Sequence, residues 1–102
     1  SALTAPARPR TQPLPTCPWD AYLAWIATLE ADSTARRKME GVPKYGEIVI
    51  DSNHVSMLAN AFDKARASQT PQQKEWSQLM LNMLHAIHQE SAIYLMVRRL
   101  RD

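Results

Sequence analysis

The spacing of apolar residues along the first two thirds of the chain predicts two amphipathic helices. Between residues 18 and 39, apolar side chains recur at intervals of three and four residues, which places them on one face of a helix. Gly41 and Pro43 follow and are expected to end this helix. A second stripe of the same period runs through residues 53–68 and predicts a second helix.

A third helix is predicted to be much longer, from Pro71 to Arg101. Thr70 can cap its first turn, Pro71 suits the first helical position, and Gln73 can complete a capping box. Neither glycine nor proline occurs between Gln72 and Arg101, so no residue is expected to interrupt it. The fold class predicted from these patterns is all-α: three helices with a long C-terminal helix.

Between the first two helices lies a short β-branched run, Ile48, Val49 and Ile50, which predicts a strand. No other segment is recognised as a strand partner. A lone strand leaves its backbone groups unpaired, which is costly when they are buried. The run is therefore expected to be an extended packing segment, or a strand that pairs with another chain across a homodimer.

Five prolines occupy the N-terminal segment, residues 1–17 with the adjoining Pro18, and proline disfavours helix in the residue before it. We therefore expect residues 1–17 to form a disordered, extended Pro-rich arm and residues 18–102 to form a single helical domain.

The predicted third helix carries apolar residues on two nearly opposite faces, and two short helices cannot cover both. The second face is expected to bind another protein, unless the N-terminal arm or residues 40–52 fold over it. Trp25 lies beside the buried stripe of the first helix and Met57 points away from that of the second, so both are further candidates. The predicted partner-binding residues are Trp25, Met57, Leu79, Ile93, Val97 and Leu100.

Composition excludes several functions. No apolar run reaches the roughly 20 residues of a membrane span, and one cysteine, Cys17, favours a reducing compartment, so the chain is expected in the cytoplasm. His85 and His88 could share a metal ion, but two ligands do not make a zinc site. With no catalytic, metal-binding or cofactor motif recognised, no enzymatic activity is expected.

The net charge of +2, from 12 basic and 10 acidic residues, does not favour nucleic-acid binding. The alternative considered is a dimeric ribbon-helix-helix DNA-binding repressor, because a strand followed by two helices fits residues 46–100. Its strand would present Glu47 and Asp51 to DNA, which suits that function poorly.

Three segments together support a resemblance: Pro18-Trp19-Asp20-Ala21-Tyr22, residues 45–50 and the long stretch from Trp76 to Arg101. With these segments in view, the whole chain resembles the QslA-type quorum-sensing anti-activators. The resemblance implies a small inhibitor that binds the ligand-binding domain of a LuxR-type transcription factor. It would occupy the factor's dimerisation surface and thereby block DNA binding.

Overall fold

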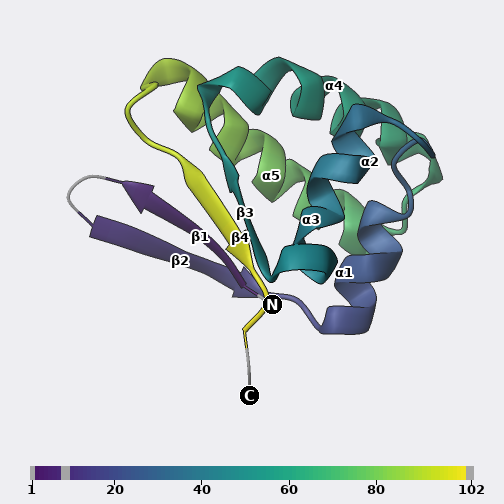
Figure 1. Cartoon of the computed structure of the whole chain (residues 1–102). Helices are drawn as coiled ribbons and strands as arrows, with labels where there is room; N and C mark the ends of the chain where they lie inside the picture. The colour runs from purple at the N-terminus through teal and green to yellow at the C-terminus, as the bar shows by residue number, and fades with distance from the viewer. Residues whose placement is uncertain (1, 8–9, 101–102) are drawn as a thin grey trace.

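The computed structural model describes residues 2–7 and 10–100, with side chains from Cys17 to Leu100. In this part of the chain a layer of helices packs against β3 and β4 of a four-stranded sheet, and the hairpin of β1 and β2 extends away from the helices (Figure 1). The strands are β1 (Ala2–Ala7), β2 (Arg10–Thr16), β3 (Glu47–Ile50) and β4 (Leu95–Arg98). The helices are α1 (Trp19–Ile26), α2 (Thr34–Met39), α3 (Gly41–Tyr45), α4 (Val55–Ala65) and α5 (Pro71–Gln89), with 3-10 turns η1 (Ser52–His54) and η2 (Arg66–Ser68) flanking α4.

The fold is therefore mixed α and β, and the all-α prediction is wrong. The strand order is β2-β1-β4-β3, and each neighbouring pair is antiparallel. The largest error concerns the C-terminal segment. Helix α5 ends at Gln89, where Glu90 adopts an extended conformation, and the chain then turns back as β4 between β1 and β3.

The pairing of β3 with β4 supplies the partner that the sequence did not reveal. Ile48 lies opposite Val97 and Ile50 opposite Leu95, and all four side chains are buried under the helices. Alternate residues of β3 point to the other face, where Glu47 and Val49 are exposed. This alternation is the expected result when only one face of an antiparallel sheet is covered.

The predicted first helix is also divided. Helix α1 ends at Ile26, a loop of residues 27–33 follows, and Ser33 caps α2 by accepting a hydrogen bond from the Arg36 N–H at 3.1 Å. Gly41 does not end a helix but begins α3, where a Cβ atom would lie 2.5 Å from Cγ2 of Ile48. Glycine at position 41 thus allows α3 to approach the sheet closely.

The second predicted helix and the start of the third fit more closely. Helix α4 with its flanking 3-10 turns covers residues 52–68, close to the range 53–68. The capping box at the start of α5 is confirmed, with Thr70 Oγ1 accepting from the Gln73 N–H at 3.2 Å and Gln73 Oε1 accepting from the Thr70 N–H at 3.0 Å. Residues 2–7 and 10–16, in the predicted arm, take an extended course as β1 and β2. The division into an arm of residues 1–17 and one domain of residues 18–102 remains a prediction.

Candidate functional site

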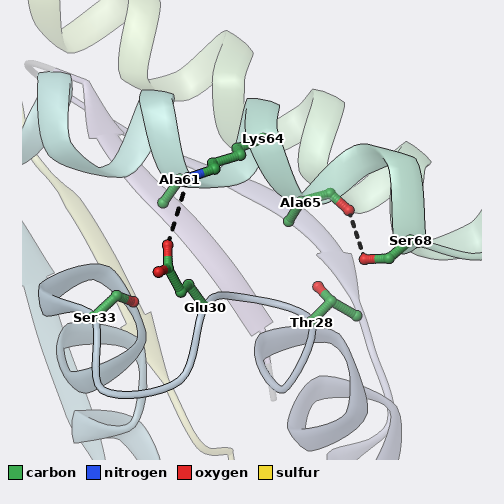
Figure 2. A pocket seen from close by; sticks show the side chains of 7 residues that line it. All are labelled: Thr28, Glu30, Ser33, Ala61, Lys64, Ala65 and Ser68. Atoms are coloured by element: carbon green, nitrogen blue, oxygen red, sulfur yellow. Dashed lines mark hydrogen bonds and ion pairs between the residues drawn. The ribbon is translucent and has the colours of Figure 1, made fainter.

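A surface pocket of about 380 Å³ lies where the 27–33 loop faces α4 and η2 (Figure 2). Its wall on the α4 side is formed by the small side chains of Ala61 and Ala65. Its other lining residues are Thr28, Glu30, Ser33, Lys64 and Ser68. Small residues leave room for an incoming side chain, so the pocket can accept part of a ligand or of another protein.

One ion pair crosses the pocket. Lys64 Nζ of α4 lies 3.6 Å from Glu30 Oε2 of the loop (Figure 2), and the two side chains are 80% and 72% exposed. Exposed pairs of this kind contribute little to folding, typically about 0–1 kcal/mol. The pair can therefore open at small cost, and each charge can then contact a binding partner.

The hydroxyl groups around the pocket are bound within the chain. Ser68 Oγ donates to the Ala65 carbonyl at 3.1 Å, and Thr28 Oγ1 donates to the Trp25 carbonyl at 2.6 Å. A hydroxyl becomes a nucleophile when it donates its hydrogen bond to a base such as an imidazole or a carboxylate. Both of these hydroxyls donate to backbone carbonyls instead. These contacts hold the pocket walls in place.

A buried polar network lies beneath the pocket. The Trp25 indole N–H donates to Ser77 Oγ at 3.0 Å, and Ser77 Oγ donates to Gln69 Oε1 at 2.8 Å. Gln69 Nε2 then donates to Thr28 Oγ1 at 2.9 Å, which links the network to the pocket wall. Since Ser77 is 0% exposed and Gln69 is 7% exposed, these polar groups depend on one another for hydrogen bonds. The network fixes the 27–33 loop against the start of α5.

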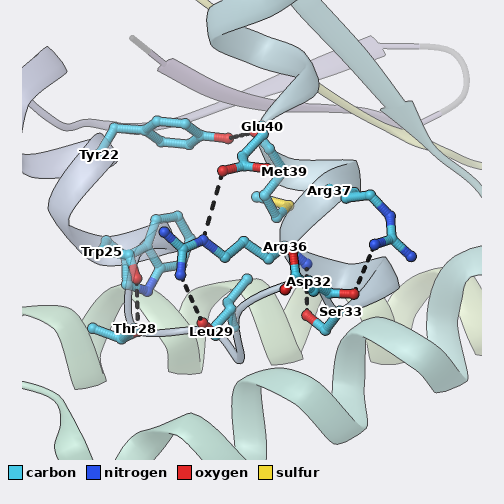
Figure 3. A network of polar contacts seen from close by, with 10 residues as sticks. All are labelled: Tyr22, Trp25, Thr28, Leu29, Asp32, Ser33, Arg36, Arg37, Met39 and Glu40. Atoms are coloured by element: carbon cyan, nitrogen blue, oxygen red, sulfur yellow. Dashed lines mark hydrogen bonds and ion pairs between the residues drawn. The ribbon is translucent and has the colours of Figure 1, made fainter.

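The outer side of the same loop is held by two arginines of α2 (Figure 3). Arg36 Nη1 donates to the Leu29 carbonyl at 3.4 Å, and its Nε lies 3.6 Å from a Glu40 carboxylate oxygen. Arg37 Nη1 donates to the Asp32 carbonyl at 2.7 Å. Asp32 has a φ of 62°, a left-handed conformation that aspartate adopts more readily than most residues. The loop is thus bound at several points along its length.

Aromatic side chains of α1 connect the pocket region to the end of the sheet. Trp25 contacts Phe62 and Trp76 in the core, with ring centroids 5.1 and 6.1 Å away. Tyr22 lies between Trp25 and Trp19, and the Arg99 guanidinium lies 4.2 Å from the centroid of the Trp19 ring. These contacts join α1 to the helical core on one side and to the residue after β4 on the other.

Tyr22 is buried in this row, and its hydroxyl donates to the Met39 carbonyl at 2.8 Å. Burial raises the pKa of the Tyr22 hydroxyl far above its usual value, and the nearby Cys17 raises it further. The neutral phenol is the form that can donate to the carbonyl, so this residue has a structural part in joining α1 to α2.

The predicted partner-binding residues do not form one surface. Trp25 and Val97 are 0% exposed, and Ile93 is 9% exposed, so these three belong to the core of their own chain. Trp25 was expected at the margin of the first helix's buried stripe; it does lie in a helix, but on the buried face of α1. Ile93 and Val97 were placed on an outer helix face because a helix was expected there. Ile93 precedes β4 and Val97 lies in it, so helical angles do not apply to these two residues.

The remaining candidates differ in exposure. Leu100 is 46% exposed, whereas Met57 and Leu79 are half-buried, with Met57 packed against the core. A role in partner binding remains a prediction for these residues. Sequence reasoning did not find the pocket, although Ser33 at a helix start and the small residues Ala61 and Ala65 were available as signals.

Within residues 2–7 and 10–100, no group of three or more His, Cys, Asp or Glu side chains could hold a metal ion. His85 and His88 are exposed on α5. In the same part of the chain, no helix combines the length and apolar character required to cross a membrane.

The fold is that of a small α/β protein with a surface pocket between the 27–33 loop and α4. A model of the family described as formate hydrogenlyase maturation protein HycH matches residues 12–99, and the chain belongs to this family. It is 84% identical over 87 residues to the formate hydrogenlyase maturation proteins HycH of Escherichia coli K12 and O157:H7. These matches cover 85% of this chain and 64% of each relative.

A more distant relative is hydrogenase-4 component J of Escherichia coli K12, which is 42% identical over 84 residues. That match covers 82% of this chain and 61% of the relative. The chain thus spans less than two thirds of the length of these curated relatives. No solved structure matches the chain.

Family membership corrects the functional prediction. The chain is not a QslA-type anti-activator, and neither a LuxR-type partner nor a ribbon-helix-helix repressor is supported. The segments that suggested the resemblance, including Tyr45 to Ile50 and the stretch after Trp76, define no specific motif. They reflect a general layout of helices, and the C-terminal part of that layout was itself wrong.

Proposed function

We propose that this chain assists the maturation of a formate hydrogenlyase by binding a protein component of that system, and that it does so without catalysis. The observation that carries the proposal is the family match over residues 12–99. The 84% identity to the formate hydrogenlyase maturation proteins, against 42% to hydrogenase-4 component J, favours formate hydrogenlyase as the system served.

The pocket between the 27–33 loop and α4 is the proposed contact surface. Its small wall residues leave space for a partner's side chain, and the exposed Lys64 and Glu30 can exchange their weak mutual pair for partner charges. The buried network under Thr28 keeps the wall rigid before binding, which reduces the entropy lost on association. We also propose a cytoplasmic location, because a single cysteine among these 102 residues is typical of a reducing compartment.

The test is complementation of an Escherichia coli strain that lacks its 84% identical relative. The gene for this chain should restore hydrogen evolution from formate. Ala61→Trp should fill the pocket and weaken partner binding. A loss of about 1.4 kcal/mol in binding free energy lowers affinity tenfold, so we expect hydrogen evolution to fall roughly tenfold or more. Asp63→Trp, an exposed position on the same helix, is the matched control and should retain activity.

Protein levels would be compared by immunoblot, and formate hydrogenlyase components would be sought by mass spectrometry in material that co-purifies with the tagged chain. Failure of the unaltered gene to restore hydrogen evolution would refute the function. Full activity of Ala61→Trp at an equal protein level would refute the pocket as the contact surface while leaving the function standing.

A further inference from the structure

Strand β3 lies at one end of the sheet, so only one of its two edges is paired with a described strand. In Figure 1, β4 runs beside β3 on the side of the other strands. We define the free edge as the backbone N–H and C=O groups of β3 that point away from β4. Such groups form a template on which another extended chain can add a strand.

The pairing with β4 identifies the residues of the free edge. The Arg99 N–H donates to the Gly46 carbonyl at 2.9 Å, so position 46 bonds toward β4. Bonding direction alternates along an antiparallel strand, so Ile48 and Ile50 also bond toward β4, whereas Glu47 and Val49 point their backbone groups the other way. Outside the helices and strand ladders, the backbone hydrogen bonds between described residues include none to Glu47 or Val49.

The end of the free edge is also defined. The Asp51 N–H donates to Nδ1 of His54 at 3.0 Å and is therefore engaged within the chain. The Asp51 side chain is 45% exposed. Its Oδ1 accepts from the Asn53 N–H at 2.9 Å and lies 3.1 Å from His54 Nδ1, so the exposed part of the carboxylate is what a partner beyond Val49 could meet. The edge thus offers two donors and two acceptors, followed by an acidic side chain.

Side chains beside the free edge specify the chemistry of an added strand. Glu47 and Val49 are exposed on the open face of the sheet, Val49 at 39%, and Asp51 continues this alternation. Arg98 lies opposite Glu47 on the β4 side, but no ion pair within the described residues includes Glu47. A strand added on the other side would place its own residues beside Glu47, Val49 and Asp51. Basic, apolar and basic residues complement this order.

A second copy of β3 would complement this order less well. A two-fold axis at Val49 would place Glu47 opposite the copy's Asp51, and an axis at Glu47 would place two copies of Glu47 together. Like charges directly opposite destabilise a strand pair. An axis at Ile48 avoids this repulsion but pairs each Glu47 with Val49, which provides no opposite charge.

We propose that the free edge of β3 binds an extended segment of another protein by strand addition, and that this segment carries a basic, an apolar and a basic residue at alternate positions. Backbone hydrogen bonds to Glu47 and Val49 hold the segment, while Glu47 and Asp51 select its charge. This site is separate from the pocket and does not depend on which complex the chain serves.

The test uses a fluorescein-labelled peptide with the sequence Lys-Val-Leu-Val-Lys, which reads the same in both strand directions. Fluorescence anisotropy should detect binding to the whole chain, and hydrogen exchange should show protection of the Val49 N–H. Lys-Val-Pro-Val-Lys, which lacks the central donor, and Glu-Val-Leu-Val-Glu should each bind roughly tenfold more weakly or not at all.

Substitutions in the chain test the same edge. Val49→Pro removes a donor that does not bond to β4, so the fold should persist while affinity falls roughly tenfold. Glu47→Lys should weaken binding of the basic peptide by a similar factor and improve binding of the acidic one. Asp63→Lys carries the same change of charge on α4 and should leave the affinity unchanged.

Equal binding of the proline-containing peptide would overturn the proposal, as would a folded Val49→Pro chain with full affinity. A chain that sediments as a dimer and dissociates on Val49→Pro substitution would also overturn it, because the second copy would then be the occupant. Should Val49→Pro fail to fold, Glu47→Lys and the two control peptides still decide the matter.

Discussion

The buried network around Ser77 provides a quantitative test of the structure. The Ser77 hydroxyl accepts a hydrogen bond from the Trp25 indole and donates one to Gln69, and Ser77 is 0% exposed. Ser77→Ala removes little volume but leaves a buried donor and a buried acceptor without partners. Each costs about 1–3 kcal/mol, so we expect a loss of about 2–4 kcal/mol in the free energy of unfolding after partial relaxation.

Thr28→Val at the other end of the network provides the comparison. Thr28 is half-buried at the pocket, so water can replace its hydroxyl as a partner for Gln69 Nε2. The expected loss is about 1 kcal/mol. In a domain of this size, where 1 kcal/mol lowers the melting temperature by about 4–8 °C, the fall should be about 8–32 °C for Ser77→Ala and about 4–8 °C for Thr28→Val.

Urea denaturation followed by tryptophan fluorescence and circular dichroism would measure both losses, and a double-mutant cycle would test the connection. Trp25→Phe removes the indole donor, so part of its cost should disappear when Ser77 is already alanine. We expect a coupling energy of about 1–2 kcal/mol. The network as described would be refuted if the stability losses of Trp25→Phe and Ser77→Ala added to within about 0.3 kcal/mol. Equal losses for Ser77→Ala and Thr28→Val would refute it as well.

Two further predictions concern other parts of the core. Since burial raises the pKa of Tyr22, the unfolded chain releases this proton at lower pH than the folded chain, and stability should fall as the pH rises above 10.0, the ordinary value for tyrosine. Tyr22→Phe should lose less stability over that pH range in urea titrations, and an unchanged slope would contradict the burial of a neutral phenol. In the sheet, Val97→Asp should destabilise the chain by about 4 kcal/mol or more because the carboxylate would be buried, whereas Val49→Asp on the open face should cost about 1 kcal/mol. Equal losses in thermal melts would contradict the direction in which β3 and β4 face the helices.

The sequence predicted those elements whose signals are local. Thr70, Pro71 and Gln73 define the start of α5 by side-chain chemistry alone, and this prediction is confirmed. The β-branched run of Ile48 to Ile50 predicted a strand, and β3 is there. In each case a few neighbouring residues determine the local conformation.

The end of α5 was missed because helix and strand patterns overlap there. Leu95 continues the helical spacing of Ile87 and Leu84, so it was assigned to the same stripe. Ile93, Leu95 and Val97 also alternate as in a half-buried strand, and all three are buried. The segment becomes a strand because it pairs with β3, where Leu95 lies opposite Ile50, 45 positions earlier in the chain. The local spacing of apolar residues does not reveal pairing over such a distance.

The candidate pocket could not be predicted for a related reason. It requires the break after Ile26, the cap at Ser33 and the packing of the intervening loop against α4. Trp25 was expected near the surface from its helical angle, whereas its indole forms a hydrogen bond with Ser77, 52 residues later in the chain. Contacts between distant segments therefore determine both the burial of this residue and the position of the pocket.

The central position of β4 has a consequence for how the protein is made. This strand pairs with β1 on one side and β3 on the other, although it follows all the other described elements in the chain. A ribosome must therefore synthesise Leu95 to Arg98 before β1 and β3 can be joined. Until then, Ile48 and Ile50 lack their strand neighbours, and the nascent chain exposes an aggregation-prone surface that a chaperone can protect.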